Sequence, residues 1–310
     1  MKFRTEVIVP RAGFAITHSD RIMMLGSCFV ESVSEKMLSA NFRVDANPFG
    51  IVYNPVSVAN GLRDLMNNRT YTEKDLFLHQ GVYHSFAHHS RFSDVSETVA
   101  LEGINSRIKQ SAGFLRETTV LIITFGTANT YRWLSSGEIV SNCHKLPAKQ
   151  FKEERLSVDQ IVEQWSELIK EVQKQSPDLR ILFTVSPIRH WKDGAHENQL
   201  NKATLLLAIN ELIKANNNCS YFPSYEMMMD DLRDYRFYAE DMIHPSSQAV
   251  DYIWEKFSNA YFNPNTKAFI KEWESIQKAL NHRPFNPDSE EHQAFLKETE
   301  RRKGELRVKS

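Results

Sequence analysis

The sequence is poor in the features that identify secreted and membrane proteins. Its three cysteines, Cys28, Cys143 and Cys219, are odd in number and widely spaced, which is typical of free thiols in a reducing compartment and not of a disulfide framework. No segment stays apolar for long enough to span a bilayer. Residues 1–20 lack the charged start, apolar middle and cleavage site of a secretory signal. We therefore expect a cytoplasmic protein that does not act at a membrane.

The chain also lacks an excess of charge of either sign. Its 38 Lys and Arg residues and 39 Asp and Glu residues give a formal net charge of −1, and the two signs are interleaved along the sequence. Such a chain has no global field to attract a polyanion, so we expect no nucleic-acid partner. The sequence has neither a glycine-rich phosphate loop nor a dinucleotide fingerprint, and we predict that it needs no cofactor.

What is present is an alternation of apolar strands and amphipathic helices, with a hydrophobic content of 41% that allows a sizeable core. The predicted strands cover residues 21–26, 42–46, 119–125, 180–186 and 219–222, and the predicted helices cover residues 30–38, 56–66, 158–174, 198–215 and 246–257. The continuous apolar runs at 119–125 and 180–186 are typical of central strands buried on both faces. The pattern predicts a three-layer α/β/α fold around a mostly parallel, flavodoxin-like sheet.

Two regions interrupt this alternation. Residues 71–91 are rich in aromatic residues and histidines, and we interpret them as an insertion that lines the site. Residues 263–310 contain charged, helix-prone stretches at 266–280 and 289–307, separated by prolines. We therefore predict one domain over residues 1–262, which contains the inserted segment at 71–91, followed by a charged helical tail over 263–310.

Ser27 is the candidate nucleophile. It follows a predicted strand and begins a predicted helix, and in a parallel sheet such a position lines the ligand crevice, where the free amides of the helix favour an oxyanion. A serine at this position is also a common helix N-cap. The neighbouring Cys28 is the alternative nucleophile, but we expect its side chain to point elsewhere and to pack as a small apolar group.

Asp241 and His244 form the candidate base and its orienting carboxylate. They lie in the sequence Asp-Met-Ile-His-Pro, between the last predicted strand and the helix at 246–257. A spacing of three residues lets one turn present the imidazole outward while the carboxylate holds the other ring nitrogen. This pair makes Ser27 a stronger candidate than its position alone would.

Other polar residues are candidates for substrate binding. His84 and His88 are four residues apart, and with His144 they suggest either a metal site or a polar pocket. No well-placed carboxylate or cysteine pair completes a metal ligand set, so we predict no metal. We expect these histidines to line a polar substrate pocket, and a surface loop with exposed histidines is an equal alternative. Arg189 and His190 follow a predicted strand and are candidates for binding an anionic or carbohydrate group, although each is equally suited to a salt bridge.

Several short motifs resemble those of the GSCFA family, which looks like a branch of the SGNH, or GDSL-type, hydrolases. The similar stretches are Gly26-Ser27-Cys28-Phe29, followed by Val30 in place of the family's alanine, then Asn47-Pro48-Phe49-Gly50-Ile51, Asn142-Cys143-His144-Lys145, Ser186-Pro187-Ile188-Arg189-His190 and Asp241 to Pro245. The resemblance covers roughly residues 21–257.

The resemblance implies a role for each matched position. It makes Ser27 the nucleophile, Asp241 and His244 the closing dyad, and the backbone amides of Ser27 and Gly50 the oxyanion donors. SGNH hydrolases carry a third block of the form Gly-x-Asn, whereas this chain has one extra residue before Asn129. Asn129 is therefore only the first candidate for the asparagine donor, and Asn142 is the alternative.

The expected function is that of a serine esterase with an SGNH-type fold. We expect an acyl-enzyme mechanism that removes a short acyl group, such as acetyl, from a small molecule, carbohydrate or glycoconjugate. An O-acyltransferase would use the same residues, and a carbohydrate-binding protein without turnover would have the same fold. The sequence leaves these alternatives and the oligomeric state open.

Overall fold

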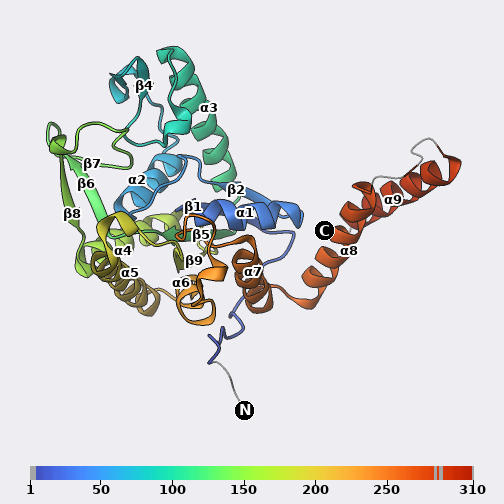
Figure 1. The fold of residues 1–310 in the computed structure, drawn as a ribbon. Helices are drawn as coiled ribbons and strands as arrows, with labels where there is room; N and C mark the ends of the chain where they lie inside the picture. Colours follow the sequence, from blue (N-terminus) through green and yellow to red (C-terminus); the bar gives the residue numbers. More distant parts are fainter. Residues whose placement is uncertain (1–4, 283–284, 286–288, 309–310) are drawn as a thin grey trace.

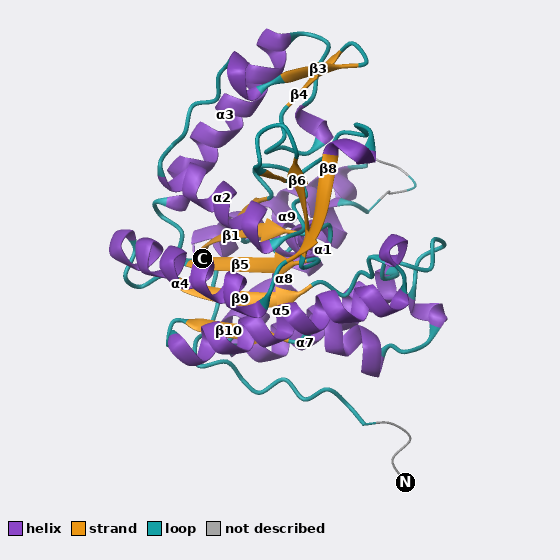
Figure 2. Cartoon of the chain, turned by 90° about the vertical axis from the view of Figure 1, so that its left-hand side faces the viewer, coloured by secondary structure: helices purple, strands orange, loops and turns teal. Residues whose placement is uncertain are grey.

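The computed structural model describes residues 5–282, 285 and 289–308. Its centre is a parallel sheet of five strands in the order β10-β9-β5-β1-β2. The strands are β1 (Arg21–Gly26), β2 (Arg43–Ala46), β5 (Val120–Phe125), β9 (Arg180–Val185) and β10 (Cys219–Phe222). This confirms the predicted parallel sheet (Figure 2). Numbered along the chain, the five strands lie in the spatial order 2-1-3-4-5, which is that of flavodoxin-like folds.

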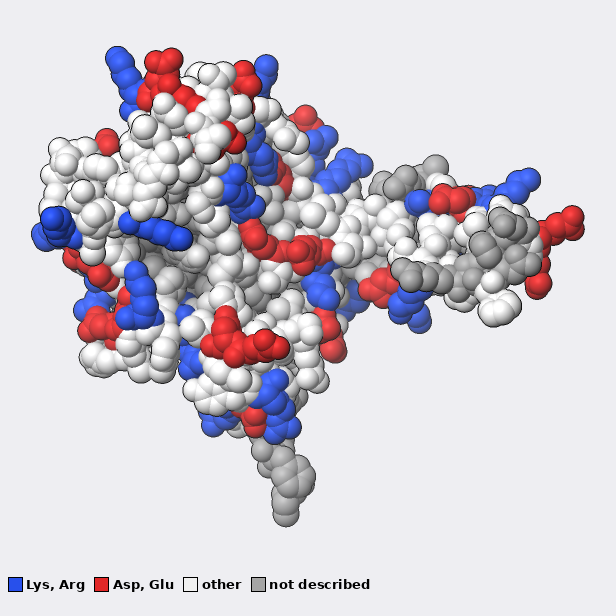
Figure 3. Space-filling model, turned by 45° about the horizontal axis from the view of Figure 1, so that its top comes forward, with Lys and Arg blue, Asp and Glu red and all other residues white. Residues whose placement is uncertain are grey.

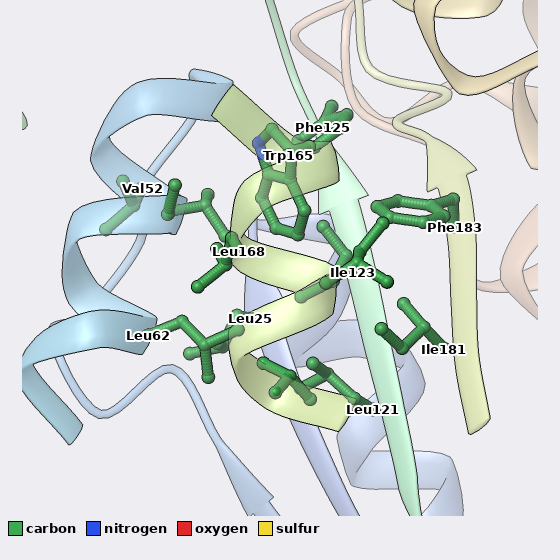
Figure 4. Packing of buried hydrophobic residues seen from close by; sticks show 14 of the residues in the cluster. Leu25, Val52, Leu62, Leu121, Ile123, Phe125, Trp165, Leu168, Ile181 and Phe183 are labelled. Atoms are coloured by element: carbon green, nitrogen blue, oxygen red, sulfur yellow. The ribbon is translucent and has the colours of Figure 1, made fainter. Parts of the chain in front are cut away.

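Both faces of the sheet are buried, because alternate residues of each central strand belong to different cores. In β5, Leu121 and Ile123 pack into the core that Figure 4 shows, whereas Val120 and Ile122 pack into the core on the opposite face. All six residues of β5 are buried. The continuous apolar run in the sequence is therefore explained by helices that cover both faces.

The helices form the two outer layers. Helices α1 (Phe29–Ser39) and α7 (Ser247–Tyr261) contribute to one core. Helices α2 (Pro55–Met66), α3 (Glu97–Leu115), α4 (Val158–Gln175) and α5 (Ala195–Ala215) contribute to the other. The three-layer prediction is thus confirmed, and α3 is an additional helix that the sequence analysis did not predict.

A second, antiparallel sheet lies beside the first and was not predicted. It consists of β6 (Asn129–Trp133), β7 (Ile139–Val140) and β8 (Phe151–Arg155), in the order β7-β6-β8. The segment 71–91 contains the hairpin of β3 (Phe77–His79) and β4 (Val82–His84). This segment packs against the second sheet, with ring centroids of Phe86 and Trp133 only 3.9 Å apart.

The C-terminal helices α8 (Pro264–Leu280) and α9 (Glu290–Val308) form an arm that projects from the body of the molecule (Figure 1). Phe269, Trp273, Ile276 and Leu306 form a separate small core between them. The indole nitrogen of Trp273 donates a hydrogen bond to the Ser39 carbonyl at 3.0 Å, which connects the arm to the end of α1.

The remaining elements are short. They are α6 (Ser224–Glu226), a π-helix at Met227–Asp231, and 3-10 turns at Glu73–Asp75, Ser90–Phe92, Ala148–Gln150, Trp191–Asp193 and Tyr235–Phe237. Among the described residues, none of the helices combines the length and the apolar character needed to cross a membrane. Charges of both signs are interspersed over the face shown in Figure 3.

Candidate active site

The site lies where the sheet changes direction. From β1 the chain passes to β2 on one side, and β5 lies on the other, so the carboxyl ends of β1 and β5 meet at the topological switch point. Gly26 ends β1 with a φ of 139°, and a side chain there would lie 2.1 Å from the Thr124 carbonyl oxygen. Only glycine allows the chain to turn at this point, and this turn places the next two residues.

Ser27 faces the interior. It is 1% exposed, and its backbone N–H donates a hydrogen bond to the Thr124 carbonyl at 3.1 Å. Its Oγ atom is buried and has no hydrogen-bond partner among the described residues. The predicted nucleophile is therefore at the expected turn, but its hydroxyl does not contact the predicted base.

Cys28 occupies the position that was expected for Ser27. Its Sγ atom lies 3.6 Å from Nε2 of His244. Cys28 is the N-cap residue of α1 and is partly exposed. Adjacent side chains at the turn do point in different directions, as expected, but it is the thiol and not the hydroxyl that points toward the histidine.

The structure brings the predicted Asp241 and His244 together in one turn. Asp241 Oδ2 lies 2.5 Å from His244 Nδ1, and Oδ1 accepts the backbone N–H groups of Ile243 and His244, each at 2.9 Å. These backbone hydrogen bonds, with that of the imidazole, lower the pKa of Asp241 to about 2. The carboxylate is thus ionised at neutral pH and fixes the imidazole so that Nε2 faces Cys28.

Burial raises the pKa of the Cys28 thiol above its ordinary value. The nearby carboxylate of Glu31 acts in the same direction. Three influences favour the thiolate instead: the backbone N–H groups of Cys28 and Phe29, which start α1, and the ammonium of Lys202. Because burial is the largest effect, the resting thiol is neutral at neutral pH, and a nucleophilic attack by Cys28 needs a base.

The predicted oxyanion donors do not converge on the Cys28 thiol, because each is engaged elsewhere. The N–H of Gly50 donates to the Asn47 carbonyl at 2.8 Å, and the N–H of Ser27 is used by β5 as described above. The amide nitrogen of Asn129 donates to Glu153 at 3.0 Å and to Asp193 at 3.1 Å. Asn129 begins β6, so its side chain belongs to the second sheet.

The alternative asparagine is also engaged elsewhere. The side-chain oxygen of Asn142 accepts the backbone N–H of His144 at 2.8 Å, which makes it a turn-forming residue. The donors that do face the sulfur are the backbone N–H groups of Cys28 and Phe29.

Arg189 and His190 lie close to the site. Arg189 donates a hydrogen bond to the Met242 carbonyl at 2.5 Å and stacks over the rings of Trp191 and Tyr238, at 4.8 and 4.7 Å. It therefore supports the turn that carries His244. The His190 ring is buried against Gly126, and this burial lowers its pKa to about 4.

The structure does not bring His84, His88 or His144 to Cys28. His88 is 1% exposed, with Nδ1 2.9 Å from Ser85 Oγ, and His144 Nε2 lies 2.8 Å from the Ser85 carbonyl. The His84 ring packs at a tilt of 36° against that of His144, with centroids 4.5 Å apart. These histidines form the interior of the 71–91 segment because its aromatic residues pack on one another and on the second sheet.

No group of three His, Cys, Asp or Glu side chains is placed to hold a metal ion in the described part of the chain. The 71–91 segment does line a cavity of about 410 Å³, together with α2 and the second sheet. The cavity is lined by Phe49, Ser57, Arg69, Tyr71 and Arg132, among others, but not by Cys28 or His244.

Lys202, a charged residue buried beside the site, was not predicted from the sequence. It is 1% exposed, and its Nζ donates to the carbonyls of Gly126, Ser186 and Ile188 at 2.7–2.9 Å. Its position in the sequence could have indicated burial, because Lys202 lies three residues before Leu205 and therefore on the same buried face of α5. A lysine in the apolar stripe of an amphipathic helix must be either paired or functional.

Tyr53 was missed as well. Its ring packs edge-on against that of His190, with centroids 5.2 Å apart, and its backbone carbonyl accepts the N–H of Gly126 at 2.7 Å. Burial and the proximity of Cys28 raise its pKa to about 12, so the hydroxyl remains a hydrogen-bond donor at neutral pH. No sequence pattern marked this residue, since it lies in a loop.

Comparisons with known proteins identify one family. The model described as "GSCFA family" matches residues 21–257, and that described as "GSCFA domain protein, C-terminal domain" matches residues 273–309. No curated protein matches the chain.

Solved structures that resemble the chain include three carbohydrate esterases. A family 3 carbohydrate esterase from Clostridium thermocellum is 10% identical, with a TM-score of 0.37 over 81% of this chain and 97% of that one. A carbohydrate esterase of family 3 from Talaromyces cellulolyticus is 8% identical, with a TM-score of 0.35 over 82% and 99%. An acetyl xylan esterase from the rumen bacterium Butyrivibrio proteoclasticus is 9% identical, with a TM-score of 0.38 over 84% and 65%.

Proposed function

The chain belongs to the GSCFA family, and we propose that it hydrolyses ester bonds through an acyl-thioester intermediate on Cys28, with His244 as the base and Asp241 as its orienting carboxylate. The observation that carries the proposal is the 3.6 Å contact between Cys28 Sγ and His244 Nε2. A nucleophile within reach of a base that is itself held by a third group is the arrangement used for acyl transfer.

The first half of the reaction forms the thioester. His244 Nε2 takes the thiol proton as Cys28 Sγ attacks the ester carbonyl, and the carbonyl electron pair moves onto oxygen. The backbone N–H groups of Cys28 and Phe29 are the donors available to hold this oxyanion. When the tetrahedral species collapses, the alcohol leaves with the proton that His244 carries.

The second half releases the acyl group. His244 removes a proton from water, which attacks the thioester carbonyl, and the Cys28 thiolate leaves and regains its proton from the imidazolium. Asp241 stays ionised throughout, because its pKa of about 2 lies far below neutral pH. It holds the proton on Nδ1 and stabilises the imidazolium each time it forms.

The proposed substrate is a short acyl ester, such as an acetyl ester, of a carbohydrate or glycoconjugate. The His244 and Asp241 side chains are 49% and 47% exposed, so a bulky alcohol portion can remain at the surface during the reaction. Trp191 and Tyr235 flank Arg189 beside the dyad and are 47% and 59% exposed. Exposed aromatic rings beside a polar group suit a sugar face better than a long lipid chain.

The test is to assay the full chain against short-chain aryl acetates and to analyse the acid-quenched protein by mass spectrometry. We expect hydrolysis with the acyl group on the peptide that contains Cys28. Cys28→Ala should abolish both signals, whereas Ser27→Ala and the matched control Cys143→Ala should retain them. An acyl group that persists in Cys28→Ala and disappears in Ser27→Ala would make Ser27 the nucleophile.

The reaction product distinguishes hydrolysis from transfer of the acyl group to an acceptor. Free acetate is expected whether or not an oligosaccharide is added. If acetate appears only as a new ester on the added sugar, the protein is an acyltransferase with the same residues. If aryl acetates are not turned over and no acyl-protein forms, the enzymatic proposal fails, and carbohydrate binding without turnover is the alternative.

A further inference from the structure

Met242, in the turn that carries His244, has a strained backbone conformation. Its φ is 58°, in the left-handed region that residues other than glycine, asparagine and aspartate seldom occupy. The Met242 side chain is 49% exposed, so burial of that side chain does not compensate for the strain. A strained residue of this kind persists only where surrounding contacts hold it, and such residues are concentrated at functional sites.

Most hydrogen bonds of this turn are made within the turn itself. The Ala239 N–H donates to the His244 carbonyl at 2.7 Å, and the Met242 N–H donates to the Ala239 carbonyl at 2.9 Å. The Asp241 carboxylate accepts two further N–H groups of the turn. These bonds define the shape of the turn, but they do not fix its position relative to Cys28.

One hydrogen bond connects the backbone of the turn to a distant segment. The Arg189 guanidinium donates to the Met242 carbonyl at 2.5 Å. Within the described ranges, no other hydrogen bond joins the backbone of residues 239–244 to a residue outside this turn. Because the carbonyl belongs to the strained residue, this bond also fixes the peptide plane that follows Met242, two residues before His244.

The Arg189 guanidinium is committed to this carbonyl and not to a carboxylate. It forms no ion pair among the described residues, so the salt bridge that the sequence left open is not formed there. Its plane lies over the rings of Trp191, Tyr238 and Tyr235, at 4.8, 4.7 and 5.6 Å from the ring centres. Aromatic rings fix the orientation of a guanidinium, so little side-chain freedom remains to be lost when it donates a hydrogen bond.

The backbone on both sides of Arg189 is anchored to buried groups. The Ile188 carbonyl accepts a hydrogen bond from the Lys202 ammonium at 2.9 Å, and the His190 N–H donates to Oδ1 of Asn198 at 3.0 Å. Lys202 and Asn198 are 1% and 2% exposed, and both belong to α5. Arg189 therefore extends from a firmly held segment at the carboxyl edge of the sheet.

We propose that Arg189 is a positioning residue of the site: by donating to the Met242 carbonyl, it holds the strained turn and the His244 imidazole at the distance from the thiol that proton transfer needs. The inference rests on the proposed role of His244 as the base for Cys28. The hydrogen bond of Arg189 goes to the backbone and not to the imidazole or the sulfur, so its effect is carried by the turn. Without Arg189 the contact between Asp241 and His244 would remain, because it is made inside the turn, but the imidazole would lose its fixed distance from the sulfur.

The first experiment measures this geometry by NMR. Because His244 Nε2 and Cys28 Sγ are 3.6 Å apart, we expect a nuclear Overhauser effect between the ring protons of the histidine and the β-protons of the cysteine. Arg189→Met removes the donor but keeps a long side chain. We expect the cross-peak to be lost or strongly weakened in this variant. Arg233, an exposed arginine that pairs with Asp230, provides the matched control, and Arg233→Met should retain the cross-peak.

Steady-state kinetics with an aryl acetate provide the second measurement. A displacement of about 1 Å can cost about a hundredfold in rate, so we expect kcat to fall about 10- to 100-fold in Arg189→Met, with KM changed by less than about twofold. Arg189→Lys retains a charged donor and should recover part of the loss. A raised KM with an unchanged kcat would show that Arg189 binds the substrate instead, and would overturn the proposal.

The strain at Met242 allows a test that separates positioning from general stability. Asparagine tolerates the left-handed conformation, so Met242→Asn should hold the turn with less help from Arg189. We therefore expect the loss of kcat caused by Arg189→Met to be at least about threefold smaller in the Met242→Asn background, a coupling that a double-mutant cycle measures. Independent effects of the two substitutions would contradict the proposal.

An Arg189→Met protein that folds, as judged by circular dichroism, and keeps both the cross-peak and kcat would also overturn the proposal. If that variant does not fold, Arg189→Gln replaces it with the same expectations, because its side chain is too short to reach the Met242 carbonyl. If the wild type does not hydrolyse aryl acetates, the proposed function fails, but the NMR comparison still decides whether Arg189 positions the imidazole. The two failures are therefore distinguishable.

Discussion

Cys28 Sγ and His244 Nε2 lie 3.6 Å apart, although 216 positions separate the two residues in the chain. The thiol comes from the start of the first helix, and the imidazole comes from the turn before the helix that packs beside it. The buried hydroxyl of Ser27 has no comparable contact. The proposal of Cys28 as the nucleophile rests on this difference between neighbouring residues.

Removing the Asp241 carboxylate should impair the reaction without unfolding the protein. Asp241→Asn loses the acceptor that holds the Nδ1 proton, so we expect the rate of aryl acetate hydrolysis to fall about 10²- to 10⁴-fold, as in other histidine-based triads. The control is Asp234→Asn, another exposed carboxylate, which pairs with Arg236. Steady-state kinetics and thermal melts of the two variants provide the comparison, and equal activity in both would contradict a catalytic role for Asp241.

Ser27→Ala should not destabilise the protein. A buried hydroxyl without a partner costs free energy, so its removal should change the free energy of unfolding by less than about 1 kcal/mol, in the stabilising direction. The matched control is Thr184→Val, because the Thr184 hydroxyl is equally buried but donates to the Phe222 carbonyl at 2.6 Å. Urea unfolding should show that the control substitution lowers the free energy of unfolding by about 1–3 kcal/mol. A comparable loss in Ser27→Ala would mean that its hydroxyl has a partner.

Gly26→Ala should prevent normal folding. The new methyl group would lie 2.1 Å from the Thr124 carbonyl oxygen, and the φ of 139° is unfavourable for any other residue. We expect a loss of at least about 3 kcal/mol in the free energy of unfolding, from combined strain and clash. Gly113→Ala, on α3 with nothing within 4 Å, is the control and should be neutral or stabilising. Wild-type stability in Gly26→Ala would contradict the described turn.

Asn129→Ala should leave catalysis nearly unchanged. The Asn129 amide is held by Glu153 and Asp193, so its loss should lower the rate of hydrolysis by less than about fivefold, whereas removal of an oxyanion donor costs about 10²- to 10³-fold. The measurement is kcat for an aryl acetate, with Asn142→Ala alongside. A hundredfold loss in either variant would restore that asparagine as the oxyanion donor.

Stability should fall as the pH is lowered from about 6.5 toward 4. Burial lowers the pKa of His88 to about 3 and that of His144 to about 4, so the folded protein keeps these rings neutral while the unfolded chain takes up protons below about pH 6.5. The unfolded state therefore gains protons that the folded state does not. Each histidine can contribute a loss of up to about 1.4 kcal/mol per pH unit in this window.

Urea unfolding at pH 7.5 and pH 5 measures this effect. His88→Asn keeps a polar partner for Ser85 but does not titrate, so it should show a weaker pH dependence than the wild type. The exposed His196, changed to Asn, should leave the pH dependence unaltered. An unchanged slope in His88→Asn would show that His88 is not the group responsible.

Sequence patterns were sufficient where local physics decides the outcome. The apolar runs of β5 and β9 marked strands buried on both faces, and Asp241 and His244 form their contact within a single turn. The same reasoning missed the second sheet, because β6 and β8 are short strands of mostly polar residues that are only partly buried. Neither strand has the continuous apolar run that identified the central sheet.

The sequence by itself determined the layers of the fold, the mostly parallel sheet and the presence of the dyad, because these follow from hydrophobic periodicity and short spacing. Only the tertiary structure decided which side chain meets His244, since the hydrogen bond from the Ser27 N–H to Thr124 orients the turn so that Ser27 is buried and Cys28 faces outward. Tertiary contacts also removed Asn129 and His88 from the site and placed Lys202 beside it. Those positions depend on contacts between segments far apart in the chain, which no local pattern encodes.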